Sequence, residues 1–251
     1  MRWSEGVCVL EGPDLIAAAL AVGVEFEALY VDAAASHDAA LESLTSLAHD
    51  QGVRVFSLGP GVVERIADAQ TPQPVLASVR FHVTAIETLP VDGFVLVLHD
   101  LRDPGNAGTI VRSADAAGVS AVVFTGQSVD PFNPKTLRAT AGSVFHLPVA
   151  VGSLEETLAY FHAAGVTSYA TVVRGATNYR DVDFTGRALV VIGNEATGLD
   201  SPSVARCRAR VTIPMRGAAE SLNAGVAASI IAFESLRQRE DASAPPPPPS
   251  L

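Results

Sequence analysis

The second half of this chain alternates short apolar runs with helical patterns, and this alternation limits the folds that are open to it. The runs are apolar throughout, so both faces of each predicted strand are expected to be buried. This pattern predicts an α/β fold with a parallel sheet covered by helices on both faces. The predicted strands are 94–98, 121–124, 145–149, 166–173, 188–192 and 211–213, and the clearest helical patterns are 108–117, 154–164 and 222–240.

A smaller α/β unit is predicted ahead of this sheet. Its strands are expected at 7–10, 28–31, 53–56 and 75–79, and its helices at about 15–22, 39–50 (capped by Ser36-His37-Asp38) and 62–69. The segment between the two units is rich in turn residues and resembles a linker. The predicted organisation is a small domain over 1–85, a linker over 86–93, a larger domain over 94–240 and a disordered Pro-rich tail over 241–251.

Composition places the chain among globular proteins. Hydrophobic residues make up 48% and charged residues 18% of its 251 residues, which is enough for a large core. Cys8 and Cys207 are the only cysteines, so we expect inert thiols in a reducing compartment. The N-terminus does not resemble a signal peptide, and the apolar stretches are about half as long as a membrane span. We therefore expect a cytoplasmic protein without membrane contact.

The charge of the chain is acidic and unevenly distributed. The net charge is −10; residues 1–90 hold 4 basic and 12 acidic residues, whereas residues 91–251 hold 13 and 15. A protein that binds a polyanion usually has a basic surface, so this one would need local clusters of arginine. The arginines that could form such clusters are Arg174, Arg180, Arg187, Arg206, Arg208, Arg210 and Arg216. The alternative is that these arginines are scattered over the surface and solvated.

Three separated segments share one sequence pattern, in which an apolar run ends and a loop of Gly, Asn, Pro and a few charged residues begins. They are residues 98–112, 190–199 and 213–223. The carboxyl ends of parallel strands lie at the same edge of a sheet, where such folds bind ligands. The sequence therefore predicts that the three loops form a single site.

The first loop, 103–108, ends a strand and opens a helix. Gly105 and Gly108 are expected to let the backbone approach a ligand closely, and Asn106 is placed to cap the helix. Arg112 follows six residues later, so it need not share the face of Asn106. On a buried face it would require an anionic partner, and on an exposed face it would be an ordinary surface arginine. His99, beside this loop, is expected to be structural.

The second and third loops offer uncharged polar groups beside apolar ones. Glu195 is expected either to accept hydrogen bonds from a ligand or to lie at a helix N-terminus. Ile213-Pro214-Met215 provides unpaired backbone groups and an apolar wall. Ser221 is expected to cap the last helix, with Asn223 in its first turn. Together these groups favour an adenosine-containing ligand over a phosphate-rich one.

Several well-known site patterns are absent from the sequence. The chain has no G-x-G-x-x-G, no G-x-x-x-x-G-K-[ST] and no G-x-S-x-G segment. A dinucleotide-dependent oxidoreductase, a P-loop nucleotidase and a serine hydrolase of the usual kinds are therefore disfavoured. The histidines and cysteines are not spaced as metal ligands, so no metal site is expected.

The three segments resemble motifs 1, 2 and 3 of the SpoU (TrmH-type) branch of the SPOUT RNA methyltransferases, in the same order. The resemblance covers about 94–240. The N-terminal unit is similar to the family's accessory L30e-like domain, through residues 10–15 and 71–77. Two differences lie within the motifs: Ala196 stands where motif 2 usually has Gly, and Ala224-Gly225 replaces the Val-Ser of motif 3.

The resemblance implies a deep trefoil knot in the C-terminal part of the larger domain, S-adenosylmethionine as the cofactor in that knot, and a homodimer formed across it. Arg112 is implied as the main catalytic residue. The implied catalytic set is Arg112, Asn106, Glu195, Ser221 and Asn223. The implied cofactor-binding set is Leu98, Ile192, Gly193, Asn194, Gly198, Ile213, Met215, Ser221 and Leu222.

The resemblance further implies transfer of a methyl group to a ribose 2′-hydroxyl of RNA. Ribosomal RNA is favoured over transfer RNA, because the accessory domain is typical of ribosomal members. Two alternatives remain open. One is a non-catalytic RNA-binding module of the same fold, and the other is a methyltransferase with a different target, such as transfer RNA, a base nitrogen or a substrate other than RNA.

Overall fold

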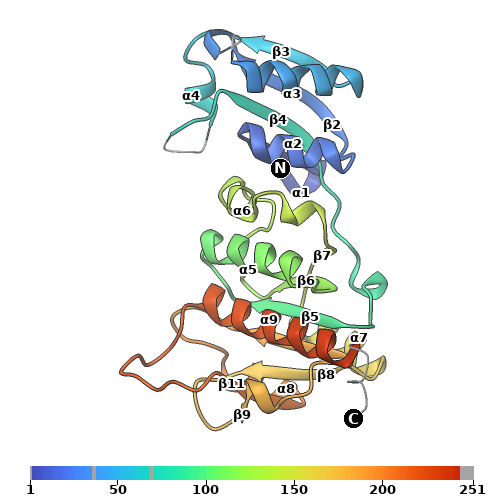
Figure 1. Ribbon diagram of the computed structural model, residues 1–251, viewed down its shortest axis with the longest axis vertical. Helices are drawn as coiled ribbons and strands as arrows, with labels where there is room; N and C mark the ends of the chain where they lie inside the picture. The colour runs from blue at the N-terminus through green and yellow to red at the C-terminus, as the bar shows by residue number, and fades with distance from the viewer. Residues whose placement is uncertain (1, 36–37, 68–70, 244–251) are drawn as a thin grey trace, which may run out of the picture.

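The computed structural model describes residues 2–35, 38–67 and 71–243, which fold around two sheets (Figure 1). The first half contains a four-stranded sheet in the order β1-β4-β2-β3, in which only β2 and β3 are parallel. The elements of this half are α1 (Arg2–Glu5), β1 (Val7–Glu11), α2 (Pro13–Ala21), β2 (Phe26–Asp32), η1 (Ala33–Ala35), α3 (Ala39–Asp50), β3 (Val55–Leu58), α4 (Val63–Ile66) and β4 (Val75–Arg80).

The second half contains a seven-stranded sheet in the order β7-β6-β5-β10-β8-β11-β9, and every neighbouring pair is parallel. Its elements are η2 (Ile86–Thr88), β5 (Phe94–His99), α5 (Pro104–Ala116), β6 (Ala121–Thr125), α6 (Pro134–Thr140), η3 (Ser143–Phe145), β7 (Val149–Gly152), α7 (Leu154–Ala163), β8 (Thr167–Thr171), β9 (Thr177–Asn178), η4 (Tyr179–Asp181), β10 (Ala188–Ile192), α8 (Ser201–Arg206), β11 (Ala209–Thr212) and α9 (Ala224–Ser243).

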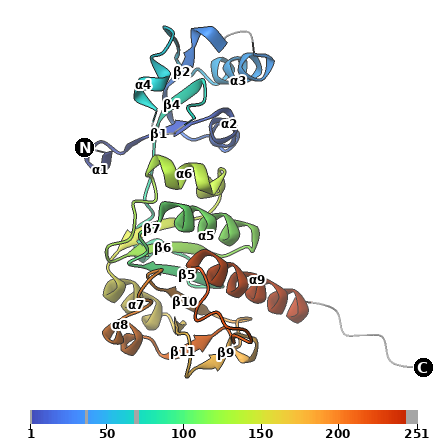
Figure 2. The ribbon, with the colours of Figure 1, turned by 90° about the vertical axis from the view of Figure 1, so that its left-hand side faces the viewer.

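The predicted double cover of this sheet is present. Alternate side chains of β5 enter two different cores: Phe94 and Leu96 pack with α5 and α9, whereas Val95 and Val97 pack with α7. Figure 2 shows α5 and α9 on one side of the sheet and α7 and α8 on the other. Because both faces are covered, β10 is apolar throughout, and β5 and β6 are apolar up to their last residues, His99 and Thr125.

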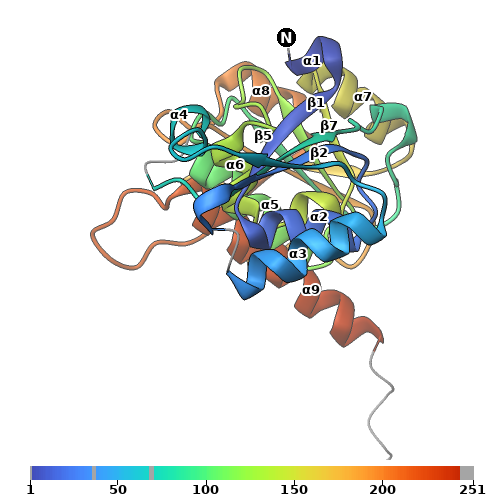
Figure 3. The same ribbon diagram turned by 90° about the horizontal axis from the view of Figure 1, so that it is seen from above.

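The two halves share a contact through α6, which packs against β1. Arg138 of α6 forms an ion pair with the buried Glu11 of β1. A Cβ on Gly142 would lie only 2.6 Å from the Ala18 Cβ, so the chain approaches α2 closely there. Seen from above, α2 and α3 lie on the same side of the molecule as α9, and α1 lies on the side of α7 (Figure 3).

Several boundaries differ from those predicted. The strand expected at 145–149 begins only at Val149, because Pro148 has no N–H for the ladder and η3 occupies Ser143–Phe145. The segment expected as a linker, 86–93, places Ile86 and Leu89 in the core beside β5. Helix α9 runs to Ser243. The predicted Ser36-His37 part of the cap, the end of the predicted helix at 68–69 and residues 244–251 of the predicted tail lie outside the described residues.

Candidate active site

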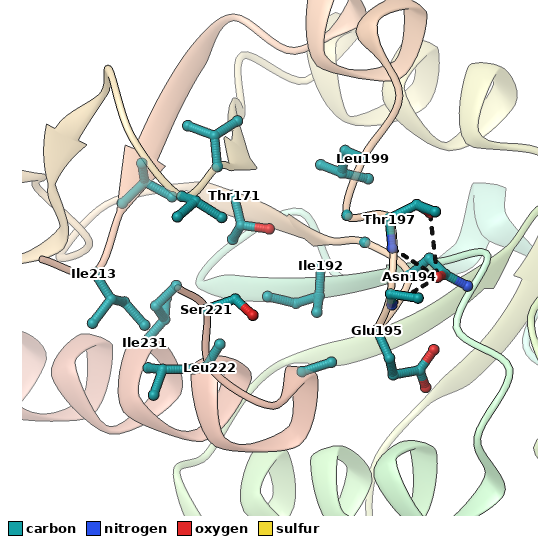
Figure 4. Close-up of a pocket in the computed structure, with 18 of the residues that line it drawn as sticks. Thr171, Ile192, Asn194, Glu195, Thr197, Leu199, Ile213, Ser221, Leu222 and Ile231 are labelled. Atoms are coloured by element: carbon teal, nitrogen blue, oxygen red, sulfur yellow. Dashed lines mark hydrogen bonds between the residues drawn. The ribbon is translucent and has the colours of Figure 1, made fainter. Parts of the chain in front are cut away.

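A pocket of about 340 Å³ opens at the carboxyl ends of β8, β10 and β11, against the start of α9 (Figure 4). Its walls are mainly apolar, and its polar groups come from loop backbone and from a few hydroxyl and amide side chains. This is the usual composition of a small-molecule site. The lining residues are Thr171, Val172, Val173, Ile192, Gly193, Asn194, Glu195, Ala196, Thr197, Gly198, Leu199, Val211, Ile213, Met215, Ser221, Leu222, Ala224, Ala227 and Ile231.

The second predicted loop is folded around Asn194. The Asn194 Oδ1 accepts hydrogen bonds from the backbone N–H groups of Ala196 and Thr197, at 2.9 and 3.2 Å (Figure 4), and its Nδ2 donates to the Asp100 carbonyl at 2.9 Å. The loop turns back so tightly that a Cβ on Gly193 would lie 2.5 Å from the Gly198 carbonyl carbon. Asn194 and Gly193 therefore shape this wall of the pocket.

The third loop ends at Asn223, which caps α9. The Asn223 Oδ1 accepts a hydrogen bond from the Val226 N–H at 3.2 Å, so Asn223 has the role that was predicted for Ser221. The prediction was wrong because α9 begins at Ala224, two residues later than expected. Ser221 instead lies on the rim of the pocket, and Figure 4 shows its side chain beside those of Ile192 and Leu222.

The first loop does not line the pocket but is tied to it by Glu195. The Glu195 carboxylate accepts hydrogen bonds from the Arg102 and Asp103 N–H groups, at 3.3 and 3.0 Å, and from Asn106 Nδ2 at 3.2 Å. Asn223 Nδ2 donates to Asn106 Oδ1 at 2.9 Å. Residues of the three predicted loops thus form one chain of hydrogen bonds, Glu195–Asn106–Asn223, which we call the amide clamp.

The helix that carries Asn106 begins earlier than predicted. Asp103 is its N-cap, accepting a hydrogen bond from the Asn106 N–H at 2.7 Å, and Pro104 is its first residue. The prediction that Asn106 caps the helix was therefore wrong.

Gly108, in the same helix, also has a role that differs from the predicted one. A Cβ there would lie 2.3 Å from the Ala139 Cβ, so this glycine permits close packing of α5 on α6 and not approach to a ligand.

The Glu195 carboxyl is held in its charged form. Partial burial alone would raise its pKa, but the hydrogen bonds from its own backbone N–H, from Asn106 and from the Asp103 and Arg102 N–H groups outweigh burial and lower the pKa below its ordinary value. At neutral pH Glu195 is a carboxylate. Its low pKa makes it a poor general base and a good acceptor for the amide clamp.

The structure brings most of the predicted residues together. Eight of the nine residues predicted to bind the cofactor line the pocket: Ile192, Gly193, Asn194, Gly198, Ile213, Met215, Ser221 and Leu222. The exception is Leu98, which is fully buried in the core beneath α5. Glu195 lines the pocket as well, and Asn106 and Asn223 join it through the amide clamp.

Arg112 lies apart from this group. It is exposed, and within the described residues it makes no hydrogen bond or ion pair. Six residues of an α-helix turn the chain by about 600°, so Arg112 points about 120° away from Asn106 and lies about 9 Å further along α5. The helix therefore presents Arg112 to solvent and not to the pocket of its own chain.

Sequence reasoning missed the walls contributed by β8 and α9. Thr171, Val172 and Val173 are the last residues of the predicted strand 166–173, and the same strand-end argument that selected the other loops would have found them. Ala227 and Ile231 lie on the inner face of the last helix. These apolar side chains carried no signal beyond their helical spacing, which also fits an ordinary core.

Other polar side chains near the sheet have structural partners. His99 Nδ1 lies 2.9 Å from Thr125 Oγ1 and its Nε2 lies 3.2 Å from Ser203 Oγ, as expected of a structural histidine. Burial raises the pKa of the Cys207 thiol to about 11, so it is not a nucleophile.

Two further features are absent from the described residues. They hold no group of three His, Cys, Asp or Glu side chains suited to a metal ion. Their helices include none that could span a membrane.

A parallel α/β sheet with an apolar pocket at its strand ends defines a ligand-binding α/β protein. Comparison with known proteins identifies the family. The sequence model of the SpoU rRNA methylase family matches residues 93–233, more than half of the chain, and that of the MRM3-like substrate binding domain matches residues 1–77. The chain belongs to the SpoU rRNA methylase family.

Named relatives and solved structures agree with this assignment. The chain is 33% identical over 184 residues, 73% of each protein, to the 23S rRNA (guanosine(2553)-2′-O)-methyltransferase RlmP of Bacillus subtilis. It is 38% identical over 193 residues, 73% of this chain and 67% of the relative, to the 23S rRNA (uridine(2479)-2′-O)-methyltransferase of Streptomyces viridochromogenes. The crystal structure of the SpoU methyltransferase AviRb from Streptomyces viridochromogenes in complex with the cofactor AdoMet matches with a TM-score of 0.84 and 29% identity, covering 96% of this chain and 93% of that one.

Proposed function

We propose that this protein is an S-adenosylmethionine-dependent RNA methyltransferase that transfers a methyl group to a ribose 2′-hydroxyl, in ribosomal RNA. The observation that carries the proposal is the pocket formed where the second and third predicted loops meet, in a chain whose relatives are named as 23S rRNA 2′-O-methyltransferases. Those two relatives modify a guanosine and a uridine, so the family alone does not fix the target nucleotide of this chain.

The pocket suits S-adenosylmethionine in size and chemistry. Its volume of about 340 Å³ lies within the range of ligand sites, and Ile192, Leu199 and Leu222 offer apolar surface for a flat base. Glu195 is the only ionisable side chain in its lining, and a carboxylate favours a cationic ligand. When bound, S-adenosylmethionine supplies a methyl group on positively charged sulfur, which is a strong electrophile.

The residues that we assign to substrate are those of the first loop and α5. The amide clamp uses one N–H of Asn106 and one lone pair of its Oδ1, which leaves the second N–H and the second lone pair for a ribose hydroxyl. Because both ends of the amide are held, its orientation is fixed before RNA arrives. Much of the rate enhancement would then come from alignment of the hydroxyl with the methyl group.

Arg112 is the main catalytic residue of this proposal. A guanidinium has a pKa above about 12, so it does not accept the proton of the hydroxyl. Because Arg112 does not face the pocket of its own chain, we assign it to the pocket of the other chain in the proposed homodimer, with hydrogen bonds to the 2′-oxygen and to a neighbouring phosphate. There it stabilises the developing alkoxide while the phosphate shares the proton. Its exposure and its lack of protein partners within the described residues support a role toward RNA.

The remaining features follow the family resemblance. Residues 1–85 are assigned as an L30e-like substrate-binding domain, which the match to a substrate-binding model supports. The C-terminal segment is assigned a deep trefoil knot, and two chains are assigned to a homodimer through the knotted domain. An apolar stripe on α9 supports the dimer: Val226 and Phe233 are each 47% exposed, with Ile230 between them. The cytoplasm is the proposed compartment.

Methyl transfer to purified ribosomal RNA tests the function. The full chain is incubated with that RNA and S-adenosylmethionine labelled in its methyl group, and the RNA is then digested with alkali. A 2′-O-methyl group blocks alkaline cleavage at its linkage, so the label should remain in dinucleotides. Label in mononucleotides would indicate a base methyltransferase, and absence of both transfer and cofactor binding in calorimetry would indicate a non-catalytic module.

A further inference from the structure

A second hollow, of about 210 Å³, lies at the carboxyl ends of β6 and β7. Neither the motif resemblance nor the cofactor pocket includes it. One of its walls comes from the N-terminal half of the chain, through α1, and the others come from the methyltransferase sheet and the loop after β6. Its lining residues are Trp3, Phe124, Thr125, Gly126, Ser128, Val129, Asp130, Pro131 and Val151.

Trp3 is held firmly at this hollow by two aromatic neighbours. Its ring lies 5.4 Å from Phe81 and 6.2 Å from the buried Phe132, both in edge-to-face geometry, and those two rings stack on each other at 4.1 Å. Trp3 nevertheless stays 48% exposed, and Val151 on the opposite wall stays 40% exposed. A rigid, half-exposed indole is the kind of surface on which unpaired bases stack.

The hollow adjoins the candidate active site through the loop that follows β5. The Gln127 N–H donates to Asp100 Oδ1 at 2.6 Å, and the Leu101 N–H donates to Ser128 Oγ at 3.0 Å. The strand order β7-β6-β5-β10 places this loop between the hollow and the cofactor pocket. Neighbouring strands lie about 4.8 Å apart, so the hollow is roughly one or two strand spacings from the first loop. The arrows of β5 and β8 point left in Figure 1, so Figure 2, which is seen from that side, looks onto the carboxyl ends of the strands. Helix α1 lies beside these strand ends.

The chemistry of the hollow suits a base better than a phosphate. Among the side chains that the structure describes, Asp130 is the only ionisable one in the lining, and none of the lining residues is a lysine or arginine. A carboxylate repels phosphate but accepts hydrogen bonds from the amino group of a base. The hydroxyls of Thr125 and Ser128 are hydrogen-bonded within the protein, so the remaining surface is aromatic and aliphatic. A flat, uncharged heterocycle matches this combination of groups.

We propose that this hollow, the Trp3 subsite, holds one unpaired nucleobase of the substrate RNA beside the nucleotide that is methylated. The proposal rests on the proposed function, because that function makes RNA the substrate. It also gives the acidic N-terminal part of the chain a means of contacting RNA. Residues 1–90 carry a net charge of −8, and base stacking, unlike phosphate binding, does not need a basic surface.

Trp3 is the only tryptophan of the chain, so its fluorescence reports on the subsite directly. The full chain is titrated with oligoadenylate, with an abasic ribose-phosphate oligomer of the same length, and with S-adenosylmethionine. Oligoadenylate should quench the emission and protect the indole from acrylamide, whereas the abasic oligomer and the cofactor should leave it unchanged. Unchanged emission with oligoadenylate, or equal quenching by the abasic oligomer, would overturn the subsite.

Two variants approach the subsite from opposite walls. Trp3→Ala removes the stacking surface, and Val151→Phe places a larger side chain in the hollow from β7 and keeps Trp3. Each should weaken binding of labelled oligoadenylate roughly tenfold or more in fluorescence anisotropy, with the affinity for S-adenosylmethionine unchanged. Phe56→Ala, which truncates a 45% exposed aromatic ring on β3, is the matched control and should bind normally.

Normal RNA affinity in both Trp3→Ala and Val151→Phe would contradict the subsite. These titrations require no methyl transfer, so they judge the subsite separately from the proposed function. If the wild-type chain methylates ribosomal RNA but its tryptophan does not respond to oligoadenylate, the subsite is wrong and the function stands. If the tryptophan responds but no RNA is methylated, the function is wrong and the base-binding surface stands.

Discussion

Asn106 shows how a single side chain of this site is oriented. Glu195 accepts from one end of its amide and Asn223 donates to the other, so a rotated amide would place N–H against N–H and oxygen against oxygen. Glu195 also accepts the N–H groups of Arg102 and Asp103. The carboxylate therefore fixes the start of α5 together with the amide that we assign to the substrate.

Glu195→Gln should impair this orientation. The glutamine amide brings its own N–H groups toward the Asn106 Nδ2 and the two backbone donors, and hydrogen bonds to a charged group are lost. We expect kcat/KM to fall about tenfold or more, given the usual strength of such bonds. Glu155→Gln, at a largely exposed carboxylate, is the control and should leave kcat/KM unchanged. Equal activity of both variants would contradict the role of the amide clamp.

The amide clamp also predicts a pH dependence. The folded pKa of Glu195 lies below its ordinary value of 4.5. Its stabilising contribution is therefore complete above the unfolded pKa and is lost as the pH falls through the lower, folded pKa. The free energy of unfolding of the wild-type chain minus that of Glu195→Gln should therefore stay level between about pH 7 and pH 5 and fall below that range. A difference that does not change below about pH 5 would contradict this role of Glu195.

Arg112 carries the chemical step in our proposal. Arg112→Ala should lower kcat at least about a hundredfold, the usual effect of removing one donor to a developing oxyanion. The affinity for S-adenosylmethionine should remain normal, because Arg112 does not line the pocket. Arg65→Ala, at an exposed arginine that is not among the candidate RNA-binding arginines, is the control and should leave kcat unchanged. Near-normal methylation by Arg112→Ala would remove Arg112 from the mechanism.

At the scale of the elements, helix α5 depends on its close contact with α6. A Cβ on Gly108 would lie 2.3 Å from the Ala139 Cβ and 2.8 Å from the Thr136 carbonyl oxygen. Gly108→Ala should therefore destabilise the fold by about 1–3 kcal/mol through overpacking, which corresponds to a fall in Tm of roughly 2–12 °C. Gly186→Ala, where no atom lies within 4 Å of the added Cβ, is the control for calorimetry. An unchanged Tm in Gly108→Ala would show that α6 adjusts without cost.

The strands of the larger sheet were predictable because burial on both faces leaves an apolar run that sequence periodicity detects. Helices α6 and α8 were missed because they are short, and the start of α5 was missed because its glycines resembled a loop. The start of each of these three helices has a local sequence signal, which is an N-cap residue followed by a proline within two positions. The segments are Asp103-Pro104 for α5, Asn133-Pro134 for α6 and Asp200-Ser201-Pro202 for α8. The hydrogen bonds between Glu195, Asn106 and Asn223 join residues about 90 to 120 positions apart, which no local pattern reveals.

At the scale of the whole molecule, two features matter: how the two sheets are placed, and which apolar surface a single chain leaves exposed. The first sheet contacts the larger domain through β1 and α6, so the N-terminal half has a defined position, at the top of the molecule beyond α6 in Figure 1. The exposed stripe of Val226, Ile230 and Phe233 on α9 is the surface that we assign to the homodimer.

Phe233→Glu tests the dimer. A charge within a buried apolar interface is costly, so we expect a dimeric wild-type chain and a monomeric variant in light scattering at the same concentration. Phe56→Glu introduces the same charge at an aromatic ring of similar exposure on β3 and should leave the mass unchanged. A dimeric Phe233→Glu would place the interface elsewhere.

The central claim is 2′-O-methylation of ribosomal RNA, and mapping of ribose methylation in cells tests it most directly. Ribosomal RNA from cells with the intact gene, with the gene deleted, and with the deletion complemented by wild type or by Arg112→Ala is compared by resistance to alkaline cleavage at every position. We expect at least one 2′-O-methyl site that disappears on deletion and returns only with the wild-type gene. Identical maps in all four strains would contradict it.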